Sequence, residues 1–197
     1  MASDHGLSAQ RLFVGMRLPT APRSQLAERA RELAAQNPRA LRLIPPENYH
    51  ITLYFIGDPR PVPAHLIQEA LAEKIPTVVA RTLPLTTTID RWGAFPSWKR
   101  PRVVWAGVQD TGGIAEIAAE VTRALTALGL EPPRRRFTPH ITVGYIRREY
   151  LAAGRRGTIA DTAFGAPVAV GLRSVSLINS TPGPDGSTYE DVKIWGA

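Results

Sequence analysis

The segment HITLYFI at residues 50–56 is repeated, as HITVGYI, at residues 140–146, 90 positions further along the chain. Polar and apolar residues alternate over the first four positions of each copy, a pattern typical of a strand with one buried face. Two of the four histidines are followed by the same Ile-Thr pair, so the repeat is far more specific than a lone short match. We therefore interpret the chain as an internal duplication.

The flanking sequence repeats in the same order. The offset of 90 carries the helix expected from Ala21 onto one expected near Thr111, and an offset of 92 places Gly15 on Gly107. Each half then consists of a strand, a helix, a proline-rich loop and a His-x-Thr strand. We expect a pseudo-two-fold axis to relate the two halves, with one His-x-Thr strand contributed by each.

Helices and strands are mixed along the chain. Hydrophobic periodicity and turn residues predict strands over 11–18, 49–56, 82–90, 103–108, part of 137–146, 173–178 and 189–194. They predict helices over 21–36, 63–74 and 114–128. Two irregular segments are expected, a loop over 92–102 with exposed aromatic residues and a Pro/Gly-rich turn over 181–186. This order is not a strict βαβ rhythm, which favours an α+β fold over a doubly wound parallel sheet.

The chain has 197 residues and a mass of 21.5 kDa, which predicts one domain with two lobes. We expect residues 1–10 to form a flexible tail and residues 11–197 to form the single bilobal domain. The absence of cysteine excludes disulfides, thiolate metal sites, Fe–S clusters and cysteine nucleophiles. A polar start and apolar runs far shorter than a bilayer span predict a cytoplasmic protein with no membrane segment.

The charge is one-sided. There are 24 Lys and Arg residues against 17 Asp and Glu residues, which gives a net charge of +7 and a pI near 10.4. The lysines are Lys74, Lys99 and Lys193, so arginine supplies almost all of the positive charge. Arginine forms bidentate contacts with phosphate, and the field around the protein attracts polyanions. A high-GC genome that favours arginine codons is the alternative explanation of this bias.

The repeated motif brings together groups that can act on a phosphate. On a strand, residues i and i+2 point to the same side, so His50 shares a face with Thr52, and His140 with Thr142. Two such strands meeting at a pseudo-two-fold axis would place two imidazoles and two hydroxyls in one cleft. Imidazole exchanges a proton near neutral pH, and a threonine hydroxyl can donate to a phosphate oxygen. The pattern predicts acid–base chemistry on a phosphodiester, with neither a metal nor another cofactor.

Two other roles for the histidines are alternatives to this one. A single histidine on a strand is usually a structural hydrogen-bonding residue, but the duplication favours a functional role. A zinc site would normally need a third protein ligand, and the sequence has no HExxH motif or clustered His/Asp set. His5 falls in the expected tail and His65 on an expected surface helix, and neither has a threonine partner. We interpret both as structural or solvated.

Several further segments match one known family. The segment PENYHITL at 46–53 resembles that family's PEN-x-HLTL motif, and FTPHITV at 137–143 resembles its second motif. The remaining matches are RLFV at 11–14, FIG at 55–57, Phe95, PRVVW at 101–105, Ser180, Gly186 and Tyr189. The chain thus resembles the 2H phosphoesterase superfamily over nearly all of residues 11–195. Within it, the chain is similar to the bacterial and archaeal RNA 2′,3′-cyclic phosphodiesterases, also called 2′-5′ RNA ligases.

The resemblance implies both a fold and a reaction. The fold would be bilobal, with two antiparallel sheets lining a central cleft and helices outside. The reaction would convert an RNA 2′,3′-cyclic phosphate end to a 2′-phosphate, with reversible, ATP-independent 2′-5′ ligation of tRNA halves in some members. His50 would be the general acid that protonates O3′, and His140 the general base that activates water or a 5′-hydroxyl. Thr52 and Thr142 would hold the non-bridging oxygens. This division of roles comes from the resemblance, because the sequence itself is symmetric.

The chain departs from many bacterial relatives at one position. Where they carry an arginine that contacts phosphate, three residues beyond the second threonine, this chain has Tyr145. The candidate replacements flank the strand: Arg134, Arg135, Arg136, Arg147 and Arg148. Each of these is also explained as a solvated surface charge. Candidates for stacking on a base are Tyr145, Phe137, Trp92, Phe95 and Trp98, whereas Tyr49 points away from His50 and is expected in the core.

The sequence is also compatible with two functions other than hydrolysis of an RNA 2′,3′-cyclic phosphate. The same site could act on a small cyclic nucleotide phosphate, although the many basic residues favour a polymer. The protein could also bind RNA without turnover, although both His-x-Thr pairs are intact. RNA with a 2′,3′-cyclic phosphate end is the expected partner. We expect a monomer, because one chain would complete the cleft.

Overall fold

A computed structural model of the chain describes residues 11–58, 62–110, 112–152, 158–183 and 186–196. The α-helices are α1 (Thr20–Gln36), α2 (Ala64–Thr82), α3 (Gly113–Thr126) and α4 (Arg148–Ala152), and short 3₁₀ turns cover Pro46–Asn48 and Thr158–Asp161. The strands are β1 (Arg11–Arg17), β2 (Leu41–Leu43), β3 (His50–Gly57), β4 (Leu85–Phe95), β5 (Val103–Val108), β6 (His140–Ile146), β7 (Val168–Leu172), β8 (Ser174–Gly183) and β9 (Gly186–Gly196). The segment expected to be a tail, 1–10, lies outside the described residues.

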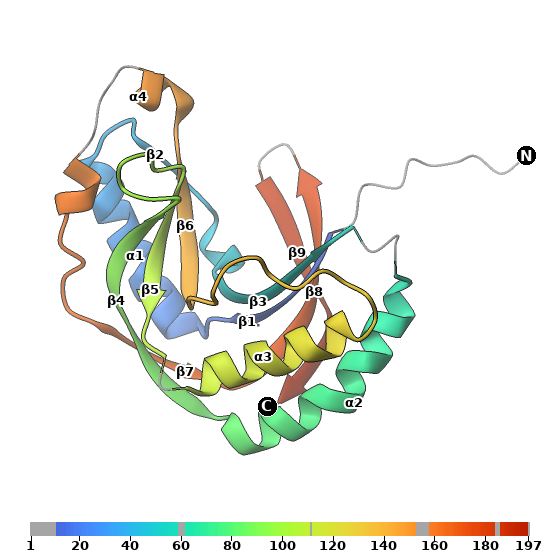
Figure 1. Cartoon of the computed structure of the whole chain (residues 1–197). Helices are drawn as coiled ribbons and strands as arrows, with labels where there is room; N and C mark the ends of the chain where they lie inside the picture. Colours follow the sequence, from blue (N-terminus) through green and yellow to red (C-terminus); the bar gives the residue numbers. More distant parts are fainter. Residues whose placement is uncertain (1–10, 59–61, 111, 153–157, 184–185, 197) are drawn as a thin grey trace, which may run out of the picture.

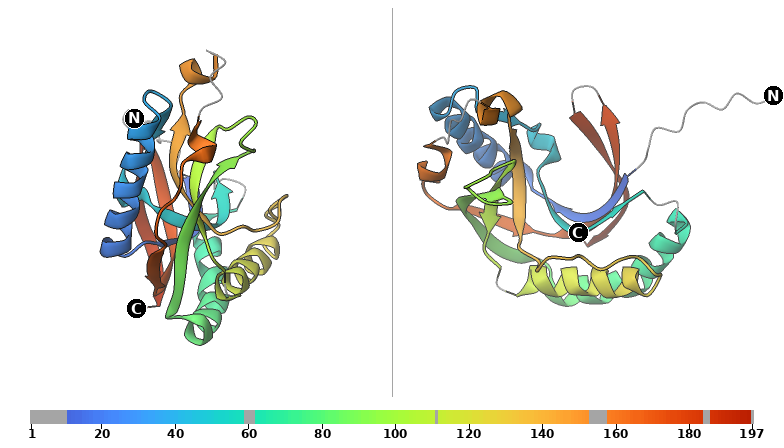
Figure 2. Two further views of the ribbon diagram at one scale, coloured as in Figure 1. Left: turned by 90° about the vertical axis from the view of Figure 1, so that its left-hand side faces the viewer. Right: turned by 45° about the horizontal axis from the view of Figure 1, so that its top comes forward.

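Within the described residues, all nine strands belong to one antiparallel sheet. Its order is β7-β4-β5-β6-β3-β1-β8-β9, with β2 added beside β6. The sheet curls into an open trough, and the longer helices lie on its outer side (Figures 1 and 2). The predicted α+β fold with outer helices is therefore confirmed. None of the helices in the described part of the chain has the length and apolar character needed to cross a membrane.

The trough consists of two four-stranded halves that meet at one point. In the described strands, β3 pairs with β6 through Ile51 and Ile141. The β3-β1-β8-β9 half lies on one side of this pair, and the β6-β5-β4-β7 half lies on the other. The two sheets expected from the family resemblance are these halves of one continuous sheet.

Strand register shows that the duplication keeps a constant offset of 90. Arg17 lies opposite His50 in the β1–β3 ladder, and Gly107 lies opposite His140 in the β5–β6 ladder. Gly107 is therefore equivalent to Arg17, and the predicted match of Gly15 with Gly107 at an offset of 92 is wrong. The two glycines meet different neighbours: a Cβ on Gly15 would lie 2.9 Å from the carbonyl oxygen of Ile51, whereas one on Gly107 would meet the side chain of Arg91.

A β-bulge is also duplicated. Ladder pairing skips Leu53 in β3 and Val143 in β6, so each is an extra residue on its strand. The bulge shifts the alternation by one position, so the next side chain on the histidine face is that of residue 55 or 145 rather than 54 or 144. Phe55 is accordingly 62% exposed and Tyr145 41% exposed. The sequence alternation alone does not reveal this shift.

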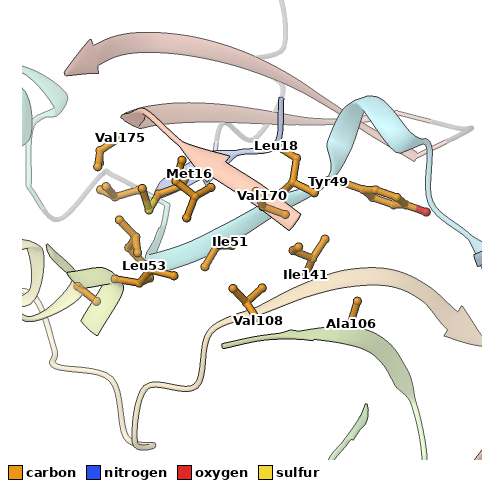
Figure 3. Close-up of a cluster of buried hydrophobic side chains, with 14 of the residues drawn as sticks. Met16, Leu18, Tyr49, Ile51, Leu53, Ala106, Val108, Ile141, Val170 and Val175 are labelled. Atoms are coloured by element: carbon orange, nitrogen blue, oxygen red, sulfur yellow. The ribbon is translucent and has the colours of Figure 1, made fainter. Parts of the chain in front are cut away.

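Each helix of the duplicated unit covers part of the opposite half. Helix α1 contacts β7 and β2, whereas α3 contacts β3 and packs side by side with α2, which reaches β9 and β8 (Figure 2). Ile51 and Ile141 are 1% and 0% exposed, and they lie in a cluster with Met16, Leu53 and Val108 (Figure 3). The residues that follow the two histidines therefore anchor the motif strands in the core. Tyr49, expected in the core, is also buried there.

Several predicted boundaries are wrong between residues 64 and 102. Helix α2 continues to Thr82 instead of ending at Lys74, and it includes Pro76. Its buried face, which includes Ile75, Val78 and Val79, extends past the proline and holds that last turn against the core. The next strand consequently starts at Leu85 rather than Thr82 and runs to Phe95, into the segment predicted to be a loop. The three aromatic residues expected to be exposed there, Trp92, Phe95 and Trp98, are half-buried.

Strands β2 and β7, of three and five residues, are not among the predicted strands. The predicted final pair of strands is present and longer, since β8 and β9 form a hairpin with a register from Ser174–Gly196 to Gly183–Gly186. The predicted turn over 181–186 is shorter than expected, because residues 181–183 and 186 already belong to these strands. Residues 184–185 lie outside the described part.

Candidate active site

The two histidines open the two motif strands, and each is oriented by a backbone carbonyl two residues before it. Nδ1 of His50 lies 2.7 Å from the carbonyl oxygen of Asn48, and Nδ1 of His140 lies 2.7 Å from that of Thr138. A carbonyl can only accept, so each Nδ1 carries the proton and donates it. In a neutral ring this leaves a lone pair on Nε2. The duplication therefore fixes both rings in the tautomer in which Nε2 can accept a proton.

The first threonine contacts its histidine directly. The hydroxyl oxygen of Thr52 lies 2.9 Å from Nε2 of His50, and in the neutral ring the hydroxyl is the donor. Thr142 occupies the equivalent position on β6, two residues after His140. Both threonine side chains are half-buried. These two hydroxyls are donors placed at the point where the two halves of the sheet meet.

A cleft of about 310 Å³ joins the two motifs. His50, Thr52 and Thr142 line it, together with Phe55, Tyr145, Phe13, Arg42, Ile44, Pro45, Asn48, Ser180, Gly186, Ser187 and Tyr189. The volume lies at the lower end of the range for small-ligand sites. Both strands thus contribute a threonine and an aromatic residue to one cavity. His140 is not part of this lining, and its ring packs instead against two aromatic side chains.

Aromatic rings surround both histidines. The ring of His50 lies 4.6 Å from that of Phe13 and 5.3 Å from that of Tyr189, which it meets edge-on. The ring of His140 lies 4.8 Å from that of Phe95, also edge-on, and 5.8 Å from that of Trp105. These contacts limit rotation of the imidazoles and remove water from around them. Rigid, poorly solvated histidines are suited to directed proton transfer.

Burial lowers the pKa of both histidines. The pKa of His50 falls to about 4, mainly through burial, with further lowering by the positive charges of Arg17 and His140 and partial compensation by the bond to Asn48. Burial also lowers the pKa of His140, while its bond to Thr138 opposes the shift. Both rings are therefore neutral at pH 7 in the free protein. An anion in the cleft would favour their protonated forms.

Arg17 connects this half of the site to the C-terminal hairpin. Its guanidinium forms an ion pair with Asp191 at 3.0 Å and donates to the carbonyl oxygens of Tyr189 and Glu47. These contacts tie β9 to β1 across the intervening strand β8, and so help to hold the ring of Tyr189 beside His50. Arg17 therefore holds one wall of the cleft and adds a positive charge near His50.

The other predicted contact residues lie in four different places. Tyr145 lines the cleft, whereas Arg147 and Arg148 line a neighbouring groove. Arg134 forms an ion pair with Glu131 at 3.5 Å, and Arg136 is exposed in the same connection between α3 and β6. Arg135 and Phe137 line a separate groove of about 350 Å³ along α3. Of the predicted contact residues, Tyr145 therefore lines the same cleft as Thr52 and Thr142, whereas the arginines at 134–136 and Phe137 do not.

The side chains that line the cleft include Phe55 and Arg42, which are not among the predicted site residues. Phe55 could have been found, because it is the 90-residue equivalent of Tyr145. Arg42 could not, because its place depends on β2: Arg42 lies opposite Tyr145 in the β2–β6 ladder, with its guanidinium carbon 5.4 Å from the centre of the Tyr145 ring. Arg42 thus supplies a positive charge beside Tyr145, the position where the family resemblance implies an arginine.

The described residues contain no group of three or more His, Cys, Asp or Glu side chains that could hold a metal ion. His65 is exposed on α2, as expected. His5 lies outside the described residues. The polar side chains that line the cleft include His50, Thr52, Thr142 and Arg42.

A curled, duplicated antiparallel sheet that contributes one His-x-Thr strand from each half defines the class of two-histidine phosphoesterases. Comparison with protein families agrees, and it is more specific. The chain belongs to the 2′-5′ RNA ligase superfamily, whose family model matches residues 19–181. The resemblance inferred from the sequence motifs is confirmed.

Individual relatives support the same assignment. A protein of Aeropyrum pernix named RNA 2′,3′-cyclic phosphodiesterase is 37% identical over 169 residues, which cover 84% of this chain and 93% of that protein. One of the same name from Archaeoglobus fulgidus is 29% identical over 186 residues, covering 94% and 99%. The crystal structure of Escherichia coli LigT complexed with 3′-AMP is similar with a TM-score of 0.70 and 26% identity, covering 95% of this chain and 97% of that one. The predicted enzyme class is therefore confirmed.

Proposed function

We propose that the protein hydrolyses 2′,3′-cyclic phosphate ends of RNA to 2′-phosphates, with His50 as general acid and His140 as general base. The observation that carries the proposal is the pair of equivalent bonds from Nδ1 to a carbonyl, which fixes both imidazoles in the tautomer needed for proton transfer. The names of the relatives from A. pernix and A. fulgidus support the reaction. The complex of E. coli LigT with 3′-AMP supports a substrate of nucleotide size.

The proposed step is a displacement at phosphorus with water as the nucleophile. Nε2 of His140 accepts a proton from the water as its oxygen bonds to phosphorus. The bond from phosphorus to O3′ breaks, and Nε2–H of His50 donates its proton to O3′. The products are a 2′-phosphate monoester and a free 3′-hydroxyl. Exchange of one proton with solvent then restores both histidines to their starting states.

The cleft also explains how negative charge would be stabilised. Hydroxyls of Thr52 and Thr142 would donate to the non-bridging oxygens, where charge increases in the transition state. To do so, Thr52 must turn from Nε2 of His50 towards the phosphate. This movement frees Nε2 for protonation at the same time as the phosphate anion raises the pKa of His50. Binding of the substrate therefore converts a histidine that is neutral in the free protein into an acid.

We propose that the same arrangement also supports the 2′-5′ ligation that the family's name implies. A 5′-hydroxyl of a second RNA end, such as a tRNA half, would replace the water, and His140 would accept its proton. The product would be a 2′-5′ phosphodiester, and no ATP is required because the cyclic phosphate bond is exchanged for another. One chain carries both motifs, so we propose that a monomer is sufficient for either reaction.

A product assay tests the proposal. The protein would be mixed, in EDTA, with a short RNA that ends in a 2′,3′-cyclic phosphate, and the product identified as a 2′- or 3′-phosphate by ³¹P NMR. We expect a 2′-phosphate from the wild type and from His65→Ala, a matched control that removes an exposed histidine. His50→Ala and His140→Ala should form almost none. A 3′-phosphate, or turnover that survives both substitutions, would contradict the mechanism, and no turnover with tight RNA binding would favour a non-catalytic RNA-binding protein.

A further inference from the structure

A second, larger groove opens beside the catalytic cleft. It has a volume of about 710 Å³, and its lining includes four arginines, Arg42, Arg102, Arg147 and Arg148, together with Tyr145 and Glu149. Arg42 and Tyr145 line both the groove and the cleft, so the two cavities are continuous at this pair. A molecule bound at the two threonines can therefore extend past Arg42 into the groove.

Backbone pairing fixes the places of the arginines. Arg42 of β2 and Val103 of β5 lie on either side of Tyr145 in β6. One residue further along, the N–H of Ile146 donates to the carbonyl oxygen of Arg102 at 2.9 Å. The N–H of Arg147 donates to that of Ala40, also at 2.9 Å. Arg42 thus lies within β2, Arg102 directly before β5 and Arg147 directly after β6. Because β2 and β5 both pair with β6, the sheet sets the relative positions of these three residues.

The groove carries a net positive charge. All four arginines are exposed, and Glu149 is the acidic residue in the lining. Among the residues that the structure describes, no acidic side chain forms an ion pair with any of the four. Arg134, by contrast, is paired with Glu131. A groove with four guanidiniums and one carboxylate is suited to binding phosphate groups, because each guanidinium offers a planar pair of donors.

Together, continuity with the cleft and the excess of positive charge indicate a ligand longer than one nucleotide. We propose that this groove binds the backbone phosphates of the RNA strand on the 5′ side of its terminal nucleotide. The terminal cyclic phosphate would lie at the histidines, and the strand would pass Arg42 and continue over Arg102 and Arg147. This inference rests on the proposed function, and it adds that the protein selects RNA ends over cyclic mononucleotides.

Substrate length tests the groove. The ratio kcat/KM would be measured for a 2′,3′-cyclic mononucleotide and for a tetranucleotide that ends in the same nucleotide. The variants are Arg102→Gln/Arg147→Gln, in the groove, and Arg134→Gln/Arg136→Gln, outside it with the same loss of charge. Arg42 is left intact because it also lines the cleft. Thermal melting would verify that both variants fold.

The wild type should prefer the tetranucleotide at least tenfold, mainly through a lower KM. The groove variant should lose most of this preference while its turnover of the mononucleotide stays within about twofold. Its binding of a tetranucleotide 2′-phosphate should also show a salt slope smaller by about 1.4, as expected for two lost contacts to a single strand. The control variant should keep the preference for length.

The two proposals fail in different ways. Equal kcat/KM for both substrates in the wild type, or equal loss of preference in the control variant, would overturn the groove while leaving the reaction intact. If the wild type turned over neither substrate, the proposed function would fail. Binding of the 2′-phosphate products, compared between mononucleotide and tetranucleotide, would then test the groove without catalysis.

Discussion

The half that carries His50 and the half that carries His140 share a backbone but differ in their side-chain surroundings. Strand register, the bulge and the bond from Nδ1 to a carbonyl are equivalent at an offset of 90. Across the ladder, however, His50 faces Arg17, whereas His140 faces Gly107. Duplication therefore supplies the paired geometry, and residues that are not duplicated distinguish the two histidines.

The different neighbours of His50 and His140 bear on how each histidine would act as acid or base. Arg17 lies opposite His50 in the same half of the sheet. Burial, together with the nearby positive charge, lowers the pKa of His50 to about 4. It is nevertheless the proposed acid, so it must gain its proton when the phosphate anion binds. His140 has Phe95 and Trp105 as neighbours, and burial lowers its pKa. It is the proposed base and is already neutral at pH 7.

The largest expected effect is the loss of either imidazole. We expect His50→Ala and His140→Ala each to lower kcat by about 10²–10⁴-fold, the usual contribution of a positioned acid or base. The double variant should lose much less than the product of the two factors, because the histidines act as a unit. Steady-state kinetics on a cyclic-phosphate RNA would measure this, and a loss in only one of the two variants would break the proposed pairing.

Smaller effects are expected for the threonines. Thr52→Val and Thr142→Val should each lower kcat/KM by about 10–100-fold, the loss of one hydrogen bond to a charged group. Thr52→Val should also raise the pKa of His50, because its hydroxyl stabilises the neutral ring. NMR titration of the imidazoles would show this shift in Thr52→Val and not in Thr142→Val. Replacement by serine is the control, since it keeps both hydroxyls, and an identical shift in both valine variants would contradict the difference between the halves.

The pH dependence follows from the same comparison. Activity needs a protonated His50 and a neutral His140, and both pKa values lie below 6.5 in the free protein. The fraction in this state falls about tenfold for each pH unit above both values, so kcat/KM should peak below pH 6.5. Because the bound phosphate raises both pKa values, the maximum of kcat should lie at higher pH. Profiles that are flat between pH 5 and 8 would be inconsistent with acid–base catalysis by these residues.

The smallest effect on rate, but a clear one on stability, is expected at the junction of the halves. Ile51→Ala and Ile141→Ala remove fully buried side chains, so each should lower the free energy of unfolding by about 2–5 kcal/mol. Urea denaturation would measure both. Similar values are expected, because the two residues pair with each other in the ladder. A cost below 1 kcal/mol for either one would show that its half can repack.

Much of the site could be predicted from the sequence, because it depends on local alternation. The pattern His-Ile-Thr placed His50 and Thr52 on one face and Ile51 in the core without knowledge of the fold, and the repeat supplied the second strand. The bulges at Leu53 and Val143 could not be predicted, because they arise from pairing with β1 and β5. Strand alternation therefore indicates the orientation of neither Phe55 nor Tyr145; a family position points to Tyr145, and the offset of 90 then points to Phe55.

Pairing between strands distant in the sequence explains why the match of Gly15 with Gly107 is wrong and why Arg42 could not be predicted. Gly15 and Gly107 were matched because both are glycines, but the first allows close approach of the Ile51 carbonyl and the second makes room for Arg91. Arg42 lies on a strand of three residues that is stabilised by pairing with β6. Strand β7 is different, because Val168, Val170 and Leu172 alternate with exposed residues and this local pattern is present in the sequence.

The most direct test of the central claim separates the two roles by changing the leaving group. In an analogue of the cyclic phosphate with sulfur in place of O3′, the departing thiolate needs no proton, because a thiol is far more acidic than an alcohol. We predict that His50→Ala hydrolyses this analogue within about tenfold of the wild-type rate, whereas His140→Ala remains as impaired as on the oxygen substrate. Recovery of His140→Ala instead of His50→Ala would show that the acid and the base are the reverse of those proposed.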